Sequence, residues 1–154
     1  MSYIIVKWLH ILSSTLLFGT GLGSAFYMFF TSLTRDARAT AVVVRYVVIA
    51  DWVFTTPTII IQPITGLYLV HLAGFPLESA WIKWTVALYL LAGVCWIPVV
   101  WMQIKMRDMA QLAATSNQSL PDLYWTYLRR WVALGIVAFL ALVVVFYLMV
   151  AKPM

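Results

Sequence analysis

The sequence predicts an all-α integral membrane protein folded as a four-helix transmembrane bundle. Hydrophobic residues make up 64% of the chain and charged residues 10%, whereas soluble globular domains have roughly 45–50% apolar and 25% charged residues. Four apolar runs reach the ~20 residues that a helix needs to cross a bilayer. The 154 residues leave room for these spans and short loops only. We therefore expect one domain over residues 1–154, with helices at about 3–33, 41–73, 79–108 and 123–151.

The first predicted helix contains the run Trp8–Leu33, which has no formal charge but includes His10. A signal peptide is the competing interpretation. The run is longer than the ~7–15-residue apolar region of a signal peptide, and no A-x-A-like site closes it. We therefore expect an uncleaved membrane helix, followed by the short charged loop Thr34–Thr40.

The second predicted helix carries polar side chains inside an apolar span, and the rest of the chain is organised around it. On an ideal helix these residues recur at i, i+4, i+7, i+11 and i+14, within about a third of the circumference. Lipid cannot satisfy their hydrogen-bonding groups, so the stripe must face other helices, a cofactor or water. The polar stripe consists of Asp51, Thr55, Thr58, Gln62 and Thr65.

The last two predicted helices follow a break at Gly74–Pro76. The third has Ser79 as a candidate N-cap and contains the uncharged run Trp84–Ile104. After a short helical extension, the polar segment Met109–Asp122 reads as a loop. The fourth helix contains the uncharged run Trp131–Ala151.

Basic residues predict the orientation. Loops one and three with their flanks hold seven of them, and the opposite face holds only Lys7, Lys83 and Lys152. By the positive-inside rule, loops one and three are cytoplasmic and both termini lie outside. We expect a multi-pass protein of the bacterial inner (plasma) membrane.

Several classes of function lack the residues that they need. The single cysteine, Cys95, allows no disulfide framework or cysteine metal site within one chain. No phosphate-binding glycine loop, H-E-x-x-H motif or nucleophile elbow is present. The net charge of +5 comes from residues beside membrane spans, which indicates topology determinants and lipid headgroup contacts rather than nucleic-acid binding.

His10 is the first candidate for a metal ligand. It shares a helical face with Ser14 and Gly21, among other small or polar residues that leave space beside the ring. Neutral imidazole is a normal axial ligand of haem iron, and bundle cores hold such cofactors. The alternative is a histidine that hydrogen-bonds across helices while the glycines allow close packing. His71 is the candidate second ligand, or else an interfacial histidine.

Lys83, Asp51 and Trp96 complete the candidate site. Lys83 either snorkels to the headgroups or offers a cation to an acidic substrate or haem propionate. Asp51 either pairs with Arg45 or Arg130 at the inner boundary, or serves as a proton relay. Trp96 belongs to a stripe with Thr85, Tyr89 and Gln103 that could stack on a planar ring, although such tryptophans also form interfacial belts and bundle packing.

A resemblance to known families adds to this interpretation. The strings LLFGTGLGSAFYM, ADWVFTTPTIIIQPITG, LYLLAGVCWIPVVWMQIKMRD and LMVAKP resemble, over nearly the whole chain, a bacterial family of predicted integral membrane proteins of unknown function. More distantly, K-x-x-H at Lys7–His10 and W-x-K at Trp81–Lys83 are similar to HemJ-type protoporphyrinogen oxidases and CopD-like membrane proteins. That similarity implies b-type haem (heme b) bound by His10, with Lys83 contacting substrate or propionate.

Two functional hypotheses follow from the sequence. The first is a b-type haem protein with a redox or electron-transfer role, including HemJ-like porphyrinogen oxidation, in which a redox protein or a second copy is the partner. The second is a cofactor-free module in the lipid bilayer, either an accessory subunit or a small-molecule permeation element built on the polar stripe.

Overall fold

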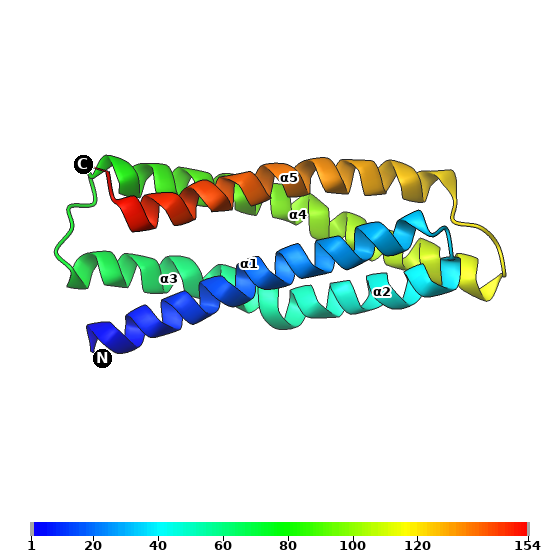
Figure 1. Cartoon of the computed structure of the whole chain (residues 1–154), viewed down its shortest axis with the longest axis horizontal. Coiled ribbons are helices and arrows are strands. Elements are labelled where there is room, and N and C mark those ends of the chain that lie inside the picture. Colours follow the sequence, from blue (N-terminus) through cyan, green and yellow to red (C-terminus); the bar gives the residue numbers. More distant parts are fainter. Residues whose placement is uncertain (1, 154) are drawn as a thin grey trace.

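The computed structural model describes residues 2–153 and is all-helical over that range. Its elements are α1 (Tyr3–Leu33), α2 (Ala37–Ala50), the π-helix η1 (Asp51–Thr55), α3 (Thr56–Leu72), α4 (Ala80–Thr115) and α5 (Asp122–Ala151) (Figure 1). α2, η1 and α3 form one 36-residue span, so the described residues contain four helices that are long and apolar enough to cross a membrane. The predicted fold class is confirmed.

Two helix boundaries differ from the sequence prediction. The second span begins at Ala37 rather than near residue 41, because Asp36 caps it and accepts hydrogen bonds from the backbone N–H groups of Arg38 and Ala39. α4 continues to Thr115, beyond the predicted end at 108. Its extension keeps an apolar face, with Ala110 and Ala113 buried. Packing on that face outweighs the polar composition of the segment.

The helices run up and down, and Figure 1 shows both termini and the α3–α4 loop at one end, with the α1–α2 and α4–α5 loops at the other. The main core lies toward the second end, where the fully buried side chains include Met28, Val44, Met106 and Tyr124. There the Tyr124 hydroxyl and the Ser32 hydroxyl are 2.7 Å apart and join α5 to α1. This end holds the described loops with the arginine-rich flanks.

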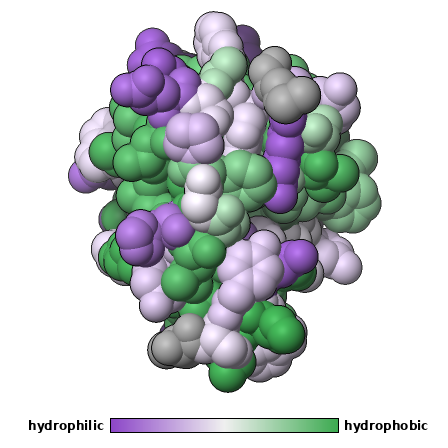
Figure 2. Space-filling model, turned by 90° about the vertical axis from the view of Figure 1, so that its left-hand side faces the viewer, coloured by the Kyte–Doolittle hydropathy of each residue, from purple (hydrophilic) through white to green (hydrophobic). Residues whose placement is uncertain are grey.

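The end with the termini is packed more loosely. α3 diverges from α4 and α5 toward this end (Figure 1), and a small cluster around Trp81, Ile82 and Leu148 lies there. Figure 2 views this end and shows scattered hydrophilic residues among hydrophobic ones. This mixture is typical of a membrane–water boundary.

The π-helix η1 has an identifiable local cause in Pro57. Proline has no N–H to donate, and its ring clashes with the carbonyl four residues back. Immediately before it, the Thr56 N–H bonds to the Asp51 carbonyl, five residues back, and the Thr56 hydroxyl donates to the same oxygen over 2.9 Å. The Thr58 hydroxyl donates to the Phe54 carbonyl over 2.7 Å. Threonine side chains thus satisfy carbonyls around the widened turn, as they do in other interrupted membrane helices.

Candidate functional site

All four spans contribute to a cavity of about 450 Å³ inside the apolar part of the bundle. Small residues on α1 and α5, including Gly21 and Gly135, leave room for it. Aromatic side chains form much of the wall, namely Phe18, Phe26, Phe29, Tyr89, Trp96, Trp131 and Phe139. The volume lies within the range of ~300–1,000 Å³ that is usual for small-molecule sites.

Asp51 is the one charged residue in the described lining of this cavity. Its side chain comes from the π-helix, is 5% exposed, and accepts a 2.8 Å hydrogen bond from the Thr55 hydroxyl. π-Helical turns occur frequently at functional sites because they re-aim side chains. The polar stripe faces the interior as predicted, since Asp51, Thr55, Thr58 and Gln62 are buried and Thr65 is half-buried.

The expected ion pair of Asp51 with Arg45 or Arg130 is wrong. Among residues 2–153 the only ion pair joins Arg107 to Asp108, and both candidate arginines are exposed. Arg45 precedes Asp51 by six residues, which places it about 240° around a helix. Arg130 also faces outward, because its neighbour Trp131 occupies the inward position on α5. Asp51 therefore lies in the apolar interior without a cationic partner among the described residues.

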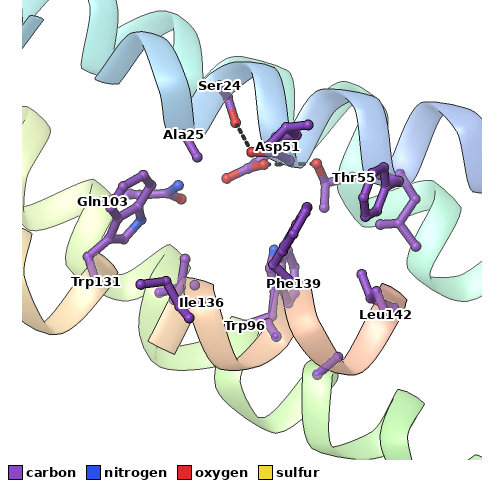
Figure 3. Close-up of a pocket in the computed structure, with 18 of the residues that line it drawn as sticks. Ser24, Ala25, Asp51, Thr55, Trp96, Gln103, Trp131, Ile136, Phe139 and Leu142 are labelled. Atoms are coloured by element: carbon purple, nitrogen blue, oxygen red, sulfur yellow. Dashed lines mark hydrogen bonds between the residues drawn. The ribbon is translucent and has the colours of Figure 1, made fainter. Parts of the chain in front are cut away.

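Two further polar atoms in the cavity wall lack partners among the described residues. They are Oε1 of Gln103, whose residue is 3% exposed, and Nε1 of the buried Trp131. Figure 3 shows the Asp51 carboxyl and the Gln103 amide pointing toward one another, with the Trp131 ring beside Gln103. Buried polar groups usually have a hydrogen-bonding partner, so this cluster offers two acceptors and one donor to a molecule in the cavity.

The cavity is open toward the surrounding lipid between α1 and α5. Its lining includes Leu22 and Phe26 on α1 and Ile136 on α5, and all three side chains are more than half exposed. Beside the opening, the Phe18 ring of α1 stacks on the Phe139 ring of α5 with centroids 5.1 Å apart. A molecule dissolved in the bilayer therefore has a lateral route to Asp51.

His10 occupies a different place, in the interface between α1 and α3. Its Nδ1 lies 2.7 Å from the Thr65 hydroxyl, and the Gln62 amide donates a 2.9 Å hydrogen bond to the His10 carbonyl. The ring also packs on Gly66, where an added Cβ would lie 3.3 Å from His10 Cε1. His10 thus links two helices, and it does not line the cavity.

The other candidates divide between the cavity and the surface. Gly21 and Trp96 line the cavity with Asp51. Ser14 is half-buried and donates to its own helix at the Ile11 carbonyl over 2.8 Å. His71 and Lys83 are exposed near the end with the termini. The predicted site residues therefore do not converge on one place.

The surroundings of the histidines do not fit a haem held between them. His10 faces Thr65, and His71 lies six residues further along α3, about 9 Å in helix rise and 240° in rotation. The described lining of the Asp51 cavity includes no histidine. Haem binding by His10, which the sequence and the resemblance both suggest, and by His71, which the sequence alone suggests, stays a prediction.

In the sequence, Gln103 stands out only as part of a stripe on the third helix, and Trp131 does not stand out. The sequence carries one signal for them: Trp131 begins an uncharged run, Gln103 lies one residue before the end of another, and both are on the same side of the membrane as Asp51. This position in the runs predicts the depth of Gln103 and Trp131 in the membrane. It does not predict whether their side chains face Asp51.

Comparisons with known proteins bear on the whole chain. Residues 4–153 match the model of a family described as predicted integral membrane protein (DUF2269). No curated protein and no solved structure matches the chain, so the more distant similarity to HemJ-type oxidases and CopD-like proteins gains no support. A model that covers nearly every residue confirms the full-length resemblance, and the chain belongs to this family of predicted integral membrane proteins.

Proposed function

We propose that this membrane protein takes up small amphipathic cations from the bilayer into the cavity around Asp51, as a binding or permeation element without a resident cofactor. The observation that carries the proposal is a carboxyl group that is 5% exposed, faces a cavity, accepts a hydrogen bond from the neutral Thr55 hydroxyl and has no cationic partner among the described residues. An ionisable side chain at such a position is expensive and marks substrate or ion pathways.

The chemistry of the wall favours an organic cation over a metal ion. A metal cation that has lost its water shell needs several oxygen ligands, but the only carboxylate in the described lining is that of Asp51. Aromatic faces attract a desolvated ammonium or phosphonium by about 2 kcal/mol, and Trp96, Trp131 and Phe139 supply such faces. Asp51 then provides the opposite charge, while Gln103 and Trp131 offer hydrogen bonds to polar substituents.

The lateral opening supports entrance from the membrane. An amphipathic cation partitions into the bilayer, and the gap between α1 and α5 leads from lipid to the cavity. With both termini outside, as the basic residues predict, Asp51 lies about 9 Å beyond Arg45 into the apolar span, in the cytoplasmic half of the bacterial inner membrane. The cavity would then collect molecules from the inner leaflet.

The test uses two probes of the same shape and opposite charge. Purified protein in detergent micelles is titrated with tetraphenylphosphonium and with tetraphenylborate, and binding is measured by tryptophan fluorescence and by equilibrium dialysis against protein-free micelles. The phosphonium is expected to bind saturably and the borate not to bind. Asp51→Asn should raise the Kd for the phosphonium at least about tenfold, which is 1.4 kcal/mol.

Asp108→Asn is the matched control because Asp108 is exposed at the Arg107 ion pair and should leave the Kd unchanged. An unchanged Kd in folded Asp51→Asn protein, or equal binding of both probes, would refute the proposal.

A further inference from the structure

A second hollow lies at the end of the same seam between α1 and α5. It is a groove lined by the end of α1, by Arg35 in the turn after it, and by the first three turns of α5. Its floor is apolar, with Phe29 and Leu33 on one side and Val132 on the other. Its rim carries Arg35 and Arg129. The groove thus has positively charged side chains at its rim and apolar side chains at its floor.

The two arginines are available to a ligand. Neither forms an ion pair among residues 2–153, and both are exposed. Arg35 adopts a left-handed backbone conformation (φ 59°) in the turn, and its guanidinium lies over the Trp125 ring, 5.6 Å from the centroid. This stacking orients Arg35 above the groove. A guanidinium presents paired N–H donors that match the oxygens of a phosphate.

Arg35 and Arg129 lie at the depth of the lipid headgroups. Arg129 stands two residues before Trp131, where the uncharged run of α5 begins, so the arginines flank the start of the hydrocarbon. The groove continues inward, because Phe29 and Val132 also line the Asp51 cavity. An occupant with a phosphate at the mouth and a hydrocarbon chain along the seam matches this arrangement.

We propose that this groove, the Arg35–Arg129 groove, binds an anionic glycerophospholipid, with its phosphate between Arg35 and Arg129 and one acyl chain over Phe29 and Val132. The charge balance selects an anionic lipid, since two arginines outweigh the single carboxylate in the lining, Asp122. That carboxylate accepts hydrogen bonds from headgroup hydroxyls. Basic pockets between transmembrane helices bind anionic headgroups in other membrane proteins. The proposal does not rest on what the Asp51 cavity binds, although the groove and the cavity share Phe29 and Val132.

Lipid competition tests this proposal on the full chain. Delipidated protein is incubated with equal amounts of phosphatidylglycerol and phosphatidylcholine that carry the same acyl chains, and retained lipids are counted by native mass spectrometry. Wild-type protein should keep one phosphatidylglycerol with at least about tenfold preference, equivalent to 1.4 kcal/mol. The double variant Arg35→Gln/Arg129→Gln should lose most of that preference, and each single variant should lose part of it.

The control separates this groove from general attraction to basic residues. Arg45→Gln/Lys105→Gln removes two exposed positive charges at the same end of the bundle that do not line the groove, and it should keep the wild-type preference. Equal loss in both double variants, or full preference in Arg35→Gln/Arg129→Gln, would overturn the proposal.

A soluble headgroup distinguishes a lipid site from a phosphate site. Glycerophosphoglycerol, which lacks acyl chains, should fail to displace the bound lipid at concentrations where phosphatidylglycerol displaces it. Displacement by the soluble headgroup at the same concentration would show that the apolar floor contributes nothing, and the lipid assignment would fall. A bulky floor variant, Val132→Trp, should weaken lipid retention with both arginines in place.

Discussion

The Thr55 hydroxyl donates a 2.8 Å hydrogen bond to Asp51 Oδ1 within the π-helix, and both side chains are at most 5% exposed. A carboxyl group so deep in an apolar span would ordinarily be held by an arginine or lysine. Here a neutral hydroxyl from the next turn holds one oxygen, and the other faces the cavity and Gln103 (Figure 3). The carboxyl is thus positioned by its own helix and remains open to a ligand.

Thr55→Val should destabilise the protein by about 1–3 kcal/mol, because the buried carboxyl loses the hydrogen bond from the Thr55 hydroxyl. Unfolding in mixed micelles measures the change. Thr115→Val is the control, since Thr115 is exposed and bonds only to carbonyls of its own helix, and its effect should stay within about 0.5 kcal/mol. Equal effects of the two variants would mean that the Asp51–Thr55 hydrogen bond contributes nothing specific.

Pro57→Ala should lower the affinity of the Asp51 cavity for tetraphenylphosphonium without lowering the melting temperature. The alanine N–H can donate to the Val53 carbonyl, so the wide turn can relax to an α-helix, and an interior proline costs about 3 kcal/mol or more. This relaxation should rotate Asp51 relative to Gln62, so that its carboxyl no longer points into the cavity. Binding assays and thermal scans measure the two effects.

Pro63→Ala is the matched control for this prediction. Pro63 lies inside α3, is exposed, and does not line the cavity, so its replacement should leave the Kd unchanged. If Pro57→Ala binds the phosphonium as tightly as the wild type, the π-helix has no part in presenting Asp51.

The sequence predicts the four spans and the polar stripe because both depend on local periodicity. Sustained apolar runs mark membrane helices whatever their neighbours, and Asp51 and Gln62 must face inward because lipid offers them no partners. The sequence predicts helix lengths less accurately, because the packing of Ala110 and Ala113 extends α4 through a polar segment.

The site depends on how the helices pack against one another. The periodicity of each helix carries no information about that packing. Gln103 and Trp131 meet Asp51 only because α4 and α5 pack at a particular rotation. The same limit explains the wrong ion pair: Arg45 is close to Asp51 in sequence but lies on another face of the helix. His10 shows the converse, because a histidine beside small residues suits both a cofactor and a close helix contact. A hydrogen bond across helices was one of the alternatives that the sequence left open, and the structure shows it to Thr65, with Gly66 beside the ring.

Reporter fusions should place both termini on the same, outer side of the membrane. The structure puts the termini at one end (Figure 1), and the opposite end carries seven basic residues against three, which the positive-inside rule assigns to the cytoplasm. A phosphatase fusion at the C-terminus should be active and a fluorescent-protein fusion dark. The reversed pattern would contradict the orientation, and it would move the Asp51 cavity to the outer half of the membrane.

The visible spectrum of the protein decides between the two roles of His10. If the resemblance to haem proteins holds, protein from haem-replete cells has a Soret band that His10→Ala abolishes, because a haem needs an axial ligand. If His10 acts only as the contact between α1 and α3, it binds no iron, and the visible spectrum does not depend on it. His10→Ala then lowers the free energy of unfolding by about 1–3 kcal/mol, because the ring is buried against Gly66 and hydrogen-bonded to Thr65.

Thr65→Val separates the two roles further. It removes the hydrogen bond to Nδ1 and keeps the imidazole, so in the contact role it reproduces part of the stability loss of His10→Ala. Average side-chain hydrogen bonds between membrane helices contribute about 0.6 kcal/mol, which sets the expected share. Neither variant should change phosphonium binding at Asp51, because neither residue lines that cavity. A Soret band in the wild type that survives in His10→Ala would exclude His10 as the ligand and require another residue to hold the iron.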